Sequence, residues 1–137
     1  MRSLRFTLLF ASLLLAACAS TGRMSESDKL ALYSSHAGAP VSDIPYVTPR
    51  GWDKIDGQHL LLTIRPTEVW LLRLSGPCLD WSGPSPTILL RRLVEGRLSF
   101  RSDRISTPDS MVTCRIDEIR PVDVAAVRAS REAMAAN

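Results

Sequence analysis

The chain has few of the residues and motifs that usually carry catalysis or metal binding. Its 137 residues include two histidines, His36 and His59, and three cysteines. The sequence contains no Cys-x-x-Cys pair, no Gly-x-Ser-x-Gly nucleophile motif and no glycine-rich phosphate loop. The common sequence signatures of zinc sites, α/β-hydrolases and nucleotide-binding folds are therefore missing. We expect no catalytic residues, no metal and no cofactor, and we expect that the protein is not an enzyme.

Long apolar runs are scarce as well, and the most continuous one lies at the N-terminus. Residues Phe6–Leu15 are mostly apolar, but a helix that spans a bilayer needs about 20 such residues. Arg2 and Arg5 precede the run, and Leu15-Ala16-Ala17-Cys18 closes it. A basic start, a short apolar core and small residues at the end are typical of a secretory signal.

The end of this signal resembles the lipobox of bacterial lipoproteins, in which the cysteine takes a diacylglycerol and a peptidase cuts just before it. The resemblance implies a signal peptide over residues 1–17, a lipidated Cys18 and a tether that ends at residue 25. Two or three acyl chains would anchor the protein stably. Ala19 follows the cysteine, and alanine at this position resembles the sorting signals that permit transfer to the outer membrane. We therefore expect the protein to be anchored at the periplasmic face of the outer membrane, with the inner membrane as the alternative. An ordinary secretory signal, with Cys18 incidental, is the other interpretation.

The excess of positive charge belongs largely to the signal. The chain has 17 basic and 14 acidic residues, and Arg2 and Arg5 would leave with the signal. The mature protein is then close to neutral, which gives no electrostatic case for nucleic acid. Arginine outnumbers lysine 15 to 2. This bias reflects either codon usage or bidentate recognition of phosphate or carboxylate.

Cys78 and Cys114 remain once Cys18 is assigned to the anchor. Disulfides persist in the oxidising compartment that export implies, and an even pair fits one bridge. Such a bridge would close a loop between cysteines 36 positions apart, worth about 3–4 kcal/mol by chain entropy. A reactive thiol or a metal pair is the alternative, but neither cysteine has a histidine near it in the sequence.

The sequence pattern over residues 26–137 predicts a single small α+β domain. Ser25 and Asp28 have the spacing of a capping box, which predicts a helix over 26–36. Asp123 is a good N-cap for a second helix that runs to about residue 135. Between them, five to seven short strands predict an antiparallel sheet or a small barrel-like roll. The clearest strands cover 59–64, 69–74 and 111–119, where Pro121 ends the last one, while 88–94 fits a strand or a helical turn.

A loop rich in glycine, proline and serine over 79–87 contains the best candidates for ligand binding, Asp80 and Trp81. Trp81 could stack on a ligand, and an apolar pocket beside it would raise the pKa of Asp80. A tryptophan packed on the disulfide and a solvated acid are the alternatives. Trp52 and Trp70 lie on apolar strands, so we expect both in the core.

Two acidic patterns are less promising. Asp53, Asp56 and His59 have a spacing that suggests a metal site, but side chains of a turn need not converge, and we expect a solvated turn. Asp117 and Glu118 are adjacent in a predicted strand. Strict alternation would place them on opposite faces, so they would not act together as acid and base.

Several segments of the mature region together resemble a known family. They are residues 36–41, Gly51-Trp52, 65–72, Gly76-Pro77-Cys78, Cys114-Arg115-Ile116 and 118–123. The family consists of small uncharacterised lipoproteins of Gram-negative bacteria and is defined as a domain of unknown function. The resemblance covers roughly residues 30–130 and implies that Cys78 and Cys114 form the family's cysteine pair. It implies no activity, ligand or catalytic residue.

The sequence therefore favours a membrane-anchored periplasmic lipoprotein that binds an envelope protein or helps to maintain the envelope. A small, tethered and cross-linked domain suits interaction better than turnover. The alternatives are a protein that binds a small ligand such as a lipid or glycan near Trp81, and an inhibitor of an envelope-directed hydrolase. An enzyme that uses His59 or Asp80 is a weaker hypothesis.

Overall fold

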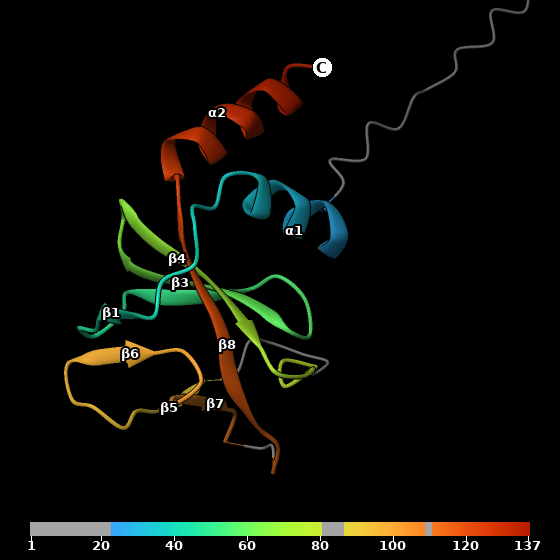
Figure 1. Cartoon of the computed structure of the whole chain (residues 1–137). Coiled ribbons are helices and arrows are strands. Elements are labelled where there is room, and N and C mark those ends of the chain that lie inside the picture. The colour runs from blue at the N-terminus through green and yellow to red at the C-terminus, as the bar shows by residue number, and fades with distance from the viewer. Residues whose placement is uncertain (1–22, 81–86, 109–110) are drawn as a thin grey trace, which may run out of the picture.

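The computed structural model describes residues 23–80, 87–108 and 111–137. The signal, Cys18 and Trp81 lie outside these ranges. Two helices flank a curled, six-stranded antiparallel sheet that forms half of a barrel, with a small two-stranded sheet beside it (Figure 1). The predicted α+β class, with one helix at each end of the domain, is confirmed. The elements are α1 (Glu26–Ser35), β1 (Asp43–Pro45), β2 (Gly51–Lys54), β3 (His59–Arg65), β4 (Glu68–Leu74), β5 (Leu89–Arg91), β6 (Arg97–Ser99), β7 (Arg104–Ser106), β8 (Thr113–Val122) and α2 (Val124–Ala135).

The six-stranded sheet has the order β2-β3-β4-β8-β7-β5, and the small sheet pairs β1 with β6. Figure 1 shows α1 and α2 together at one end of the molecule and β5, β6 and β7 at the other, with β8 running between them. None of the helices among the described residues has the length and apolar character needed to cross a membrane.

Both helices begin at the predicted caps. The Ser25 hydroxyl accepts a hydrogen bond from the Asp28 N–H at 3.1 Å, and the Asp123 carboxylate accepts one from the Ala126 N–H at 2.9 Å. These bonds satisfy N–H groups that have no partner in the first helical turn. Beyond α1, the Gly38 N–H donates to the Pro121 carbonyl at 2.8 Å, which ties the segment after the helix to β8.

The sheet is buried on two faces. The barrel face carries the larger core, and the helix face carries a smaller one. Leu60, Leu61 and Leu62 are all buried, as predicted from their lack of alternation. The barrel face comprises Leu60, Leu62, Leu72, Leu74, Ile116 and Ile119 and packs on Ile44 and Leu98 of the small sheet. The helix face comprises Leu61, Leu71 and Val122 and packs on Val127 of α2 and Leu30 and Tyr33 of α1.

The predicted disulfide is present. Cys78, in the loop after β4, is bonded to Cys114 of β8, and their Cα atoms are 6.0 Å apart. Both cysteines are buried and belong to the core of the barrel face. The bridge therefore joins that loop to the strand that extends to the far end of the sheet.

β8 differs from its predicted form in two ways. It continues through Pro121 to Val122, where the sequence had predicted a break. Of the two backbone hydrogen-bonding groups, proline lacks only the N–H donor. The Pro121 carbonyl still accepts a hydrogen bond from the Gly38 N–H. The second difference is a bulge: Arg73 lies opposite Glu118, but the next residue, Leu74, lies opposite Ile116. One residue of β8 is therefore unpaired at this point, which breaks the alternation of side chains.

Candidate functional site

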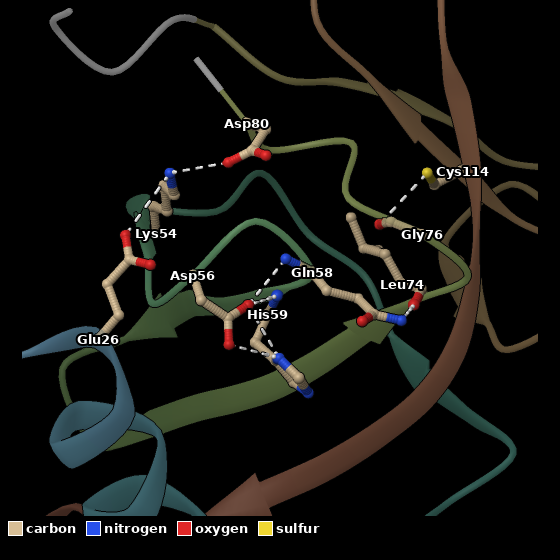
Figure 2. Close-up of polar contacts among 9 residues, drawn as sticks. All are labelled: Glu26, Lys54, Asp56, Gln58, His59, Leu74, Gly76, Asp80 and Cys114. Carbon is tan, nitrogen blue, oxygen red and sulfur yellow. Dashed lines mark hydrogen bonds and ion pairs between the residues drawn. The ribbon is translucent and has the colours of Figure 1, made fainter. Parts of the chain in front are cut away.

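The structure places Asp80 in an exposed ion-pair cluster. Its carboxylate is 4.0 Å from the Lys54 Nζ, which also lies 3.7 Å from a Glu26 carboxylate oxygen (Figure 2). The side chain of Asp80 is 76% exposed. The described residues therefore do not give it the apolar surroundings that the sequence suggested. The cluster links the loop after the disulfide to β2 and α1. Ligand binding by Trp81 stays a prediction, because that residue lies outside the described ranges.

Asp56 and His59 form a close pair in the turn between β2 and β3 (Figure 2). Both carboxylate oxygens of Asp56 are 2.9 Å from the His59 Nδ1. One of them also accepts from the backbone N–H groups of Gln58 and His59, each at 2.7 Å. Burial alone would raise the pKa of Asp56, but these hydrogen bonds together bring it below its ordinary value.

This pair does not extend into a metal site among the described residues, where no group of three or more possible ligands occurs. Asp53 lies on β2 opposite Leu61 and not beside Asp56. The cross-strand neighbour of His59 is Arg73. Within the described part of the chain, the imidazole hydrogen bonds run to Asp56. The arrangement fixes a turn and orients the ring.

A more unusual feature lies at the far end of the sheet. Arg91 of β5 is in register with Arg104 of β7, and Arg104 is in register with Arg115 of β8. We call these three residues the arginine row. All three are exposed, and residues in register on neighbouring strands lie about 5 Å apart on the same face. Within the described residues, Arg91 and Arg104 form no ion pair, while the Arg115 Nε lies 2.7 Å from an Asp117 oxygen.

Further positive charge surrounds Asp117. A hydrogen bond from Arg115 lowers the pKa of the Asp117 carboxyl, and the charges of Arg115, Arg73 and Arg101 lower it further. Glu118 is also close to Arg73, at 3.5 Å. Because of the bulge in β8, Ile116 and Ile119 both belong to the barrel-face core, so Asp117 and Glu118 between them do not alternate across the sheet. The prediction that Asp117 and Glu118 are separated on opposite faces is wrong.

A second surface is the gap between the two edge strands of the half-barrel, β2 and β5. A pocket of about 380 Å³ lies there, lined by Tyr46, Pro49, Gly51, Trp52, Leu62, Thr87, Ile88 and Leu90. The Arg92 guanidinium stacks 4.4 Å above the centre of the Tyr46 ring. Trp52 and Trp70, both expected in the core, are half-buried and pack against the core of the barrel face. Trp52 also lines this pocket. We call it the edge pocket.

Sequence reasoning missed both surfaces. The arginine bias was a visible signal, but the alignment of Arg91 with Arg104 depends on strand register, which no local pattern specified. The edge pocket likewise depends on how far the sheet curls. Of the residues that line it, Thr87 belongs to the 79–87 loop in which the sequence predicts a ligand site.

These features define a small, disulfide-bonded α+β domain with a curled antiparallel sheet and two exposed candidate binding surfaces. The chain belongs to a family of unknown function (DUF6491), whose model matches residues 1–137. No curated protein and no solved structure matches the chain.

Proposed function

We propose that the protein is a lipoprotein anchored through Cys18 to the periplasmic face of the outer membrane, and that it binds an acidic envelope protein and is not an enzyme. The anchor rests on the signal pattern and on the lipobox resemblance. The binding function rests on one observation, the arginine row formed by Arg91, Arg104 and Arg115.

Like charges directly opposite one another destabilise a sheet. The arginine row contains two such pairs in succession, and Arg91 and Arg104 have no ion-pair partner among the described residues. A partner that carries carboxylates would remove this repulsion. Guanidinium groups bind carboxylates through two parallel hydrogen bonds, and arginine is enriched where proteins bind one another.

The surroundings of the row favour an extended protein segment as the partner. β5 is an edge strand, and edge strands can accept an added strand. Leu89, on the same face of β5 as Arg91, is 43% exposed, and Leu93 in the following loop is 77% exposed. The surface thus combines apolar side chains with arginines. We infer a partner with an extended segment that carries acidic and apolar residues two positions apart, on one face.

Site-specific photo-crosslinking in cells tests this proposal. A photoreactive amino acid replaces Leu93, beside the arginine row, in the full-length protein, and the matched control carries it at Thr67, in the exposed turn between β3 and β4. We expect position 93, but not 67, to capture one envelope protein near stoichiometry. If that protein were a hydrolase, its activity with and without this protein would test the alternative that the protein is an inhibitor.

Charge exchange makes the test specific. Arg91→Glu should abolish capture from position 93, and reversing an acidic residue at the mapped contact of the partner should restore it. Capture that is unchanged by Arg91→Glu, or equal from positions 67 and 93, would refute the arginine row as the docking surface. In the same cells, Cys18→Ser should abolish labelling by palmitate and release the protein from the outer-membrane fraction. Retained labelling would refute the anchor.

The edge pocket supports a second candidate function, the binding of a small lipid or glycan. Its aromatic and aliphatic lining is typical of ligand pockets, and a volume of about 380 Å³ suffices for a small ligand. Trp52→Ala should then abolish retention of lipid or glycan by the purified protein while Arg104→Gln leaves it intact. Retention that is unaffected by Trp52→Ala would rule out this pocket.

A further inference from the structure

A separate pocket lies between the helices and the sheet, at the opposite end of the molecule from the arginine row. Its volume is about 230 Å³. The helix face of the sheet and α2 supply its apolar wall, formed by Leu61, Val69, Val122, Val124 and Val127. Leu61, Val122 and Val127 are buried and belong to the core on the helix face. We call this cavity the helix pocket.

Opposite charges line the helix pocket without pairing. Asp53 comes from the edge strand β2, whereas Arg128 and Arg131 come from α2. Within the described residues, no ion pair joins Asp53 to either arginine. Asp53 is in register with Leu61, so its side chain is on the helix face of the sheet.

The arginine side is partly preorganised. The Arg131 guanidinium donates a hydrogen bond of 2.9 Å to the Tyr33 hydroxyl and lies 5.5 Å from the centre of the Tyr33 ring. Tyr33 belongs to α1, so both helices help to position this group. Arg128, one position beyond the buried Val127, has no hydrogen-bond or ion-pair partner in the described part of the chain and is available to an anion.

We propose that the helix pocket binds the zwitterion of a free aliphatic amino acid of about the size of leucine. Its carboxylate would lie at Arg128 and Arg131, its ammonium group at Asp53, and its side chain on the apolar wall. A ligand with both charges matches the unpaired groups on the two sides better than a simple anion or cation. A cavity of about 150 Å³ accommodates benzene, so one of 230 Å³ fits about nine non-hydrogen atoms. This inference does not depend on the anchor or on the arginine row.

Methyl NMR of the full-length, detergent-solubilised protein tests the proposal with a matched set of probes. Leucine carries both charges, 4-methylpentanoate lacks the ammonium group, and 3-methylbutylamine lacks the carboxylate. We expect saturable shifts of the Leu61, Val69, Val122 and Val127 methyl signals with leucine. The two singly charged probes should bind at least about tenfold more weakly, because each loses a charge-assisted contact. The absence of a saturable shift with leucine, or equal affinity for 4-methylpentanoate, would overturn the proposal.

Variants separate binding from folding. Asp53→Asn and Arg128→Gln should each weaken leucine binding by about tenfold, with the remaining methyl spectrum unchanged. Their controls make the same charge changes elsewhere: Glu132→Gln is on an exposed part of α2, and Arg104→Gln is at the far end of the sheet. If the controls weaken leucine binding as much as the pocket variants, the binding is not in the helix pocket.

Discussion

The Asp103 carboxylate accepts a hydrogen bond of 2.7 Å from the Ser99 N–H, while the Asp103 N–H donates to the Ser99 carbonyl at 3.2 Å. The other carboxylate oxygen accepts from the Leu93 N–H at 3.0 Å. Asp103 is 1% exposed, so it is a charged group held in the interior by backbone donors. It joins the turn between β6 and β7 to the segment that follows β5, next to the arginine row.

Replacing Asp103 with alanine should lower the free energy of unfolding by about 2–3 kcal/mol, because two N–H groups lose a charged acceptor. Urea denaturation measures the change. Asp103→Asn keeps an acceptor oxygen and should be less destabilising. Asp80→Ala, at an exposed position, is the control and should change stability by under about 1 kcal/mol. Equal effects of Asp103→Ala and Asp80→Ala would contradict this role.

The disulfide should contribute strongly to stability. The double variant Cys78→Ser, Cys114→Ser should be less stable than the native protein by about 3–4 kcal/mol, because the cross-link no longer restricts the unfolded chain. Urea denaturation with and without reductant measures this difference. Reductant should destabilise the native protein and leave the double variant unchanged. Equal stability of the native protein and the double variant in the absence of reductant would show that the bridge contributes nothing to the stability of the fold.

The sequence predicted best what local interactions determine. Ser25 and Asp123 cap their helices through bonds to N–H groups three positions along the chain. The disulfide pairing followed from the number of cysteines once Cys18 was assigned to the anchor, a role that stays a prediction. In each case the deciding information lay within a few residues or in a simple count.

Long-range pairing accounts for what sequence reasoning missed. β4 pairs with β8, more than 40 positions later, and the bulge in β8 arises from that pairing. The bulge interrupts the alternation between Ile116 and Ile119, so a strictly alternating strand could not anticipate where Asp117 and Glu118 lie. The match of Arg91 with Arg104 likewise depends on strand register. The candidate binding surfaces therefore belong to the tertiary structure and not to any motif.

Asp56 should make stability depend on pH in the acid range. Burial would raise its pKa, but the hydrogen bonds from Gln58 and His59 bring it below the ordinary value. A carboxyl whose pKa is lower in the folded state stabilises the fold above its unfolded pKa of about 3.9, and this contribution is lost as the pH falls through the folded pKa.

The stability difference between the native protein and Asp56→Asn should accordingly be largest near neutral pH and shrink below about pH 5. Urea denaturation across this range measures it, and Asp80→Asn serves as the exposed control. A difference that stays constant with pH would show that the Asp56 charge contributes nothing.

Arg104 offers a test that distinguishes binding from stability. It has an arginine in register on each side, so Arg104→Gln should raise the free energy of unfolding at low salt by about 0.2–1 kcal/mol. The gain should largely vanish in about 1 M salt, where screening acts within about 3 Å. Arg50→Gln, at an exposed position just before β2, should show no comparable gain. If Arg104 served only the fold, its replacement would not make the protein more stable. A gain in stability together with loss of partner capture would therefore mean that the arginine row serves binding at a cost to the sheet. A loss of stability in Arg104→Gln at low salt would contradict that interpretation.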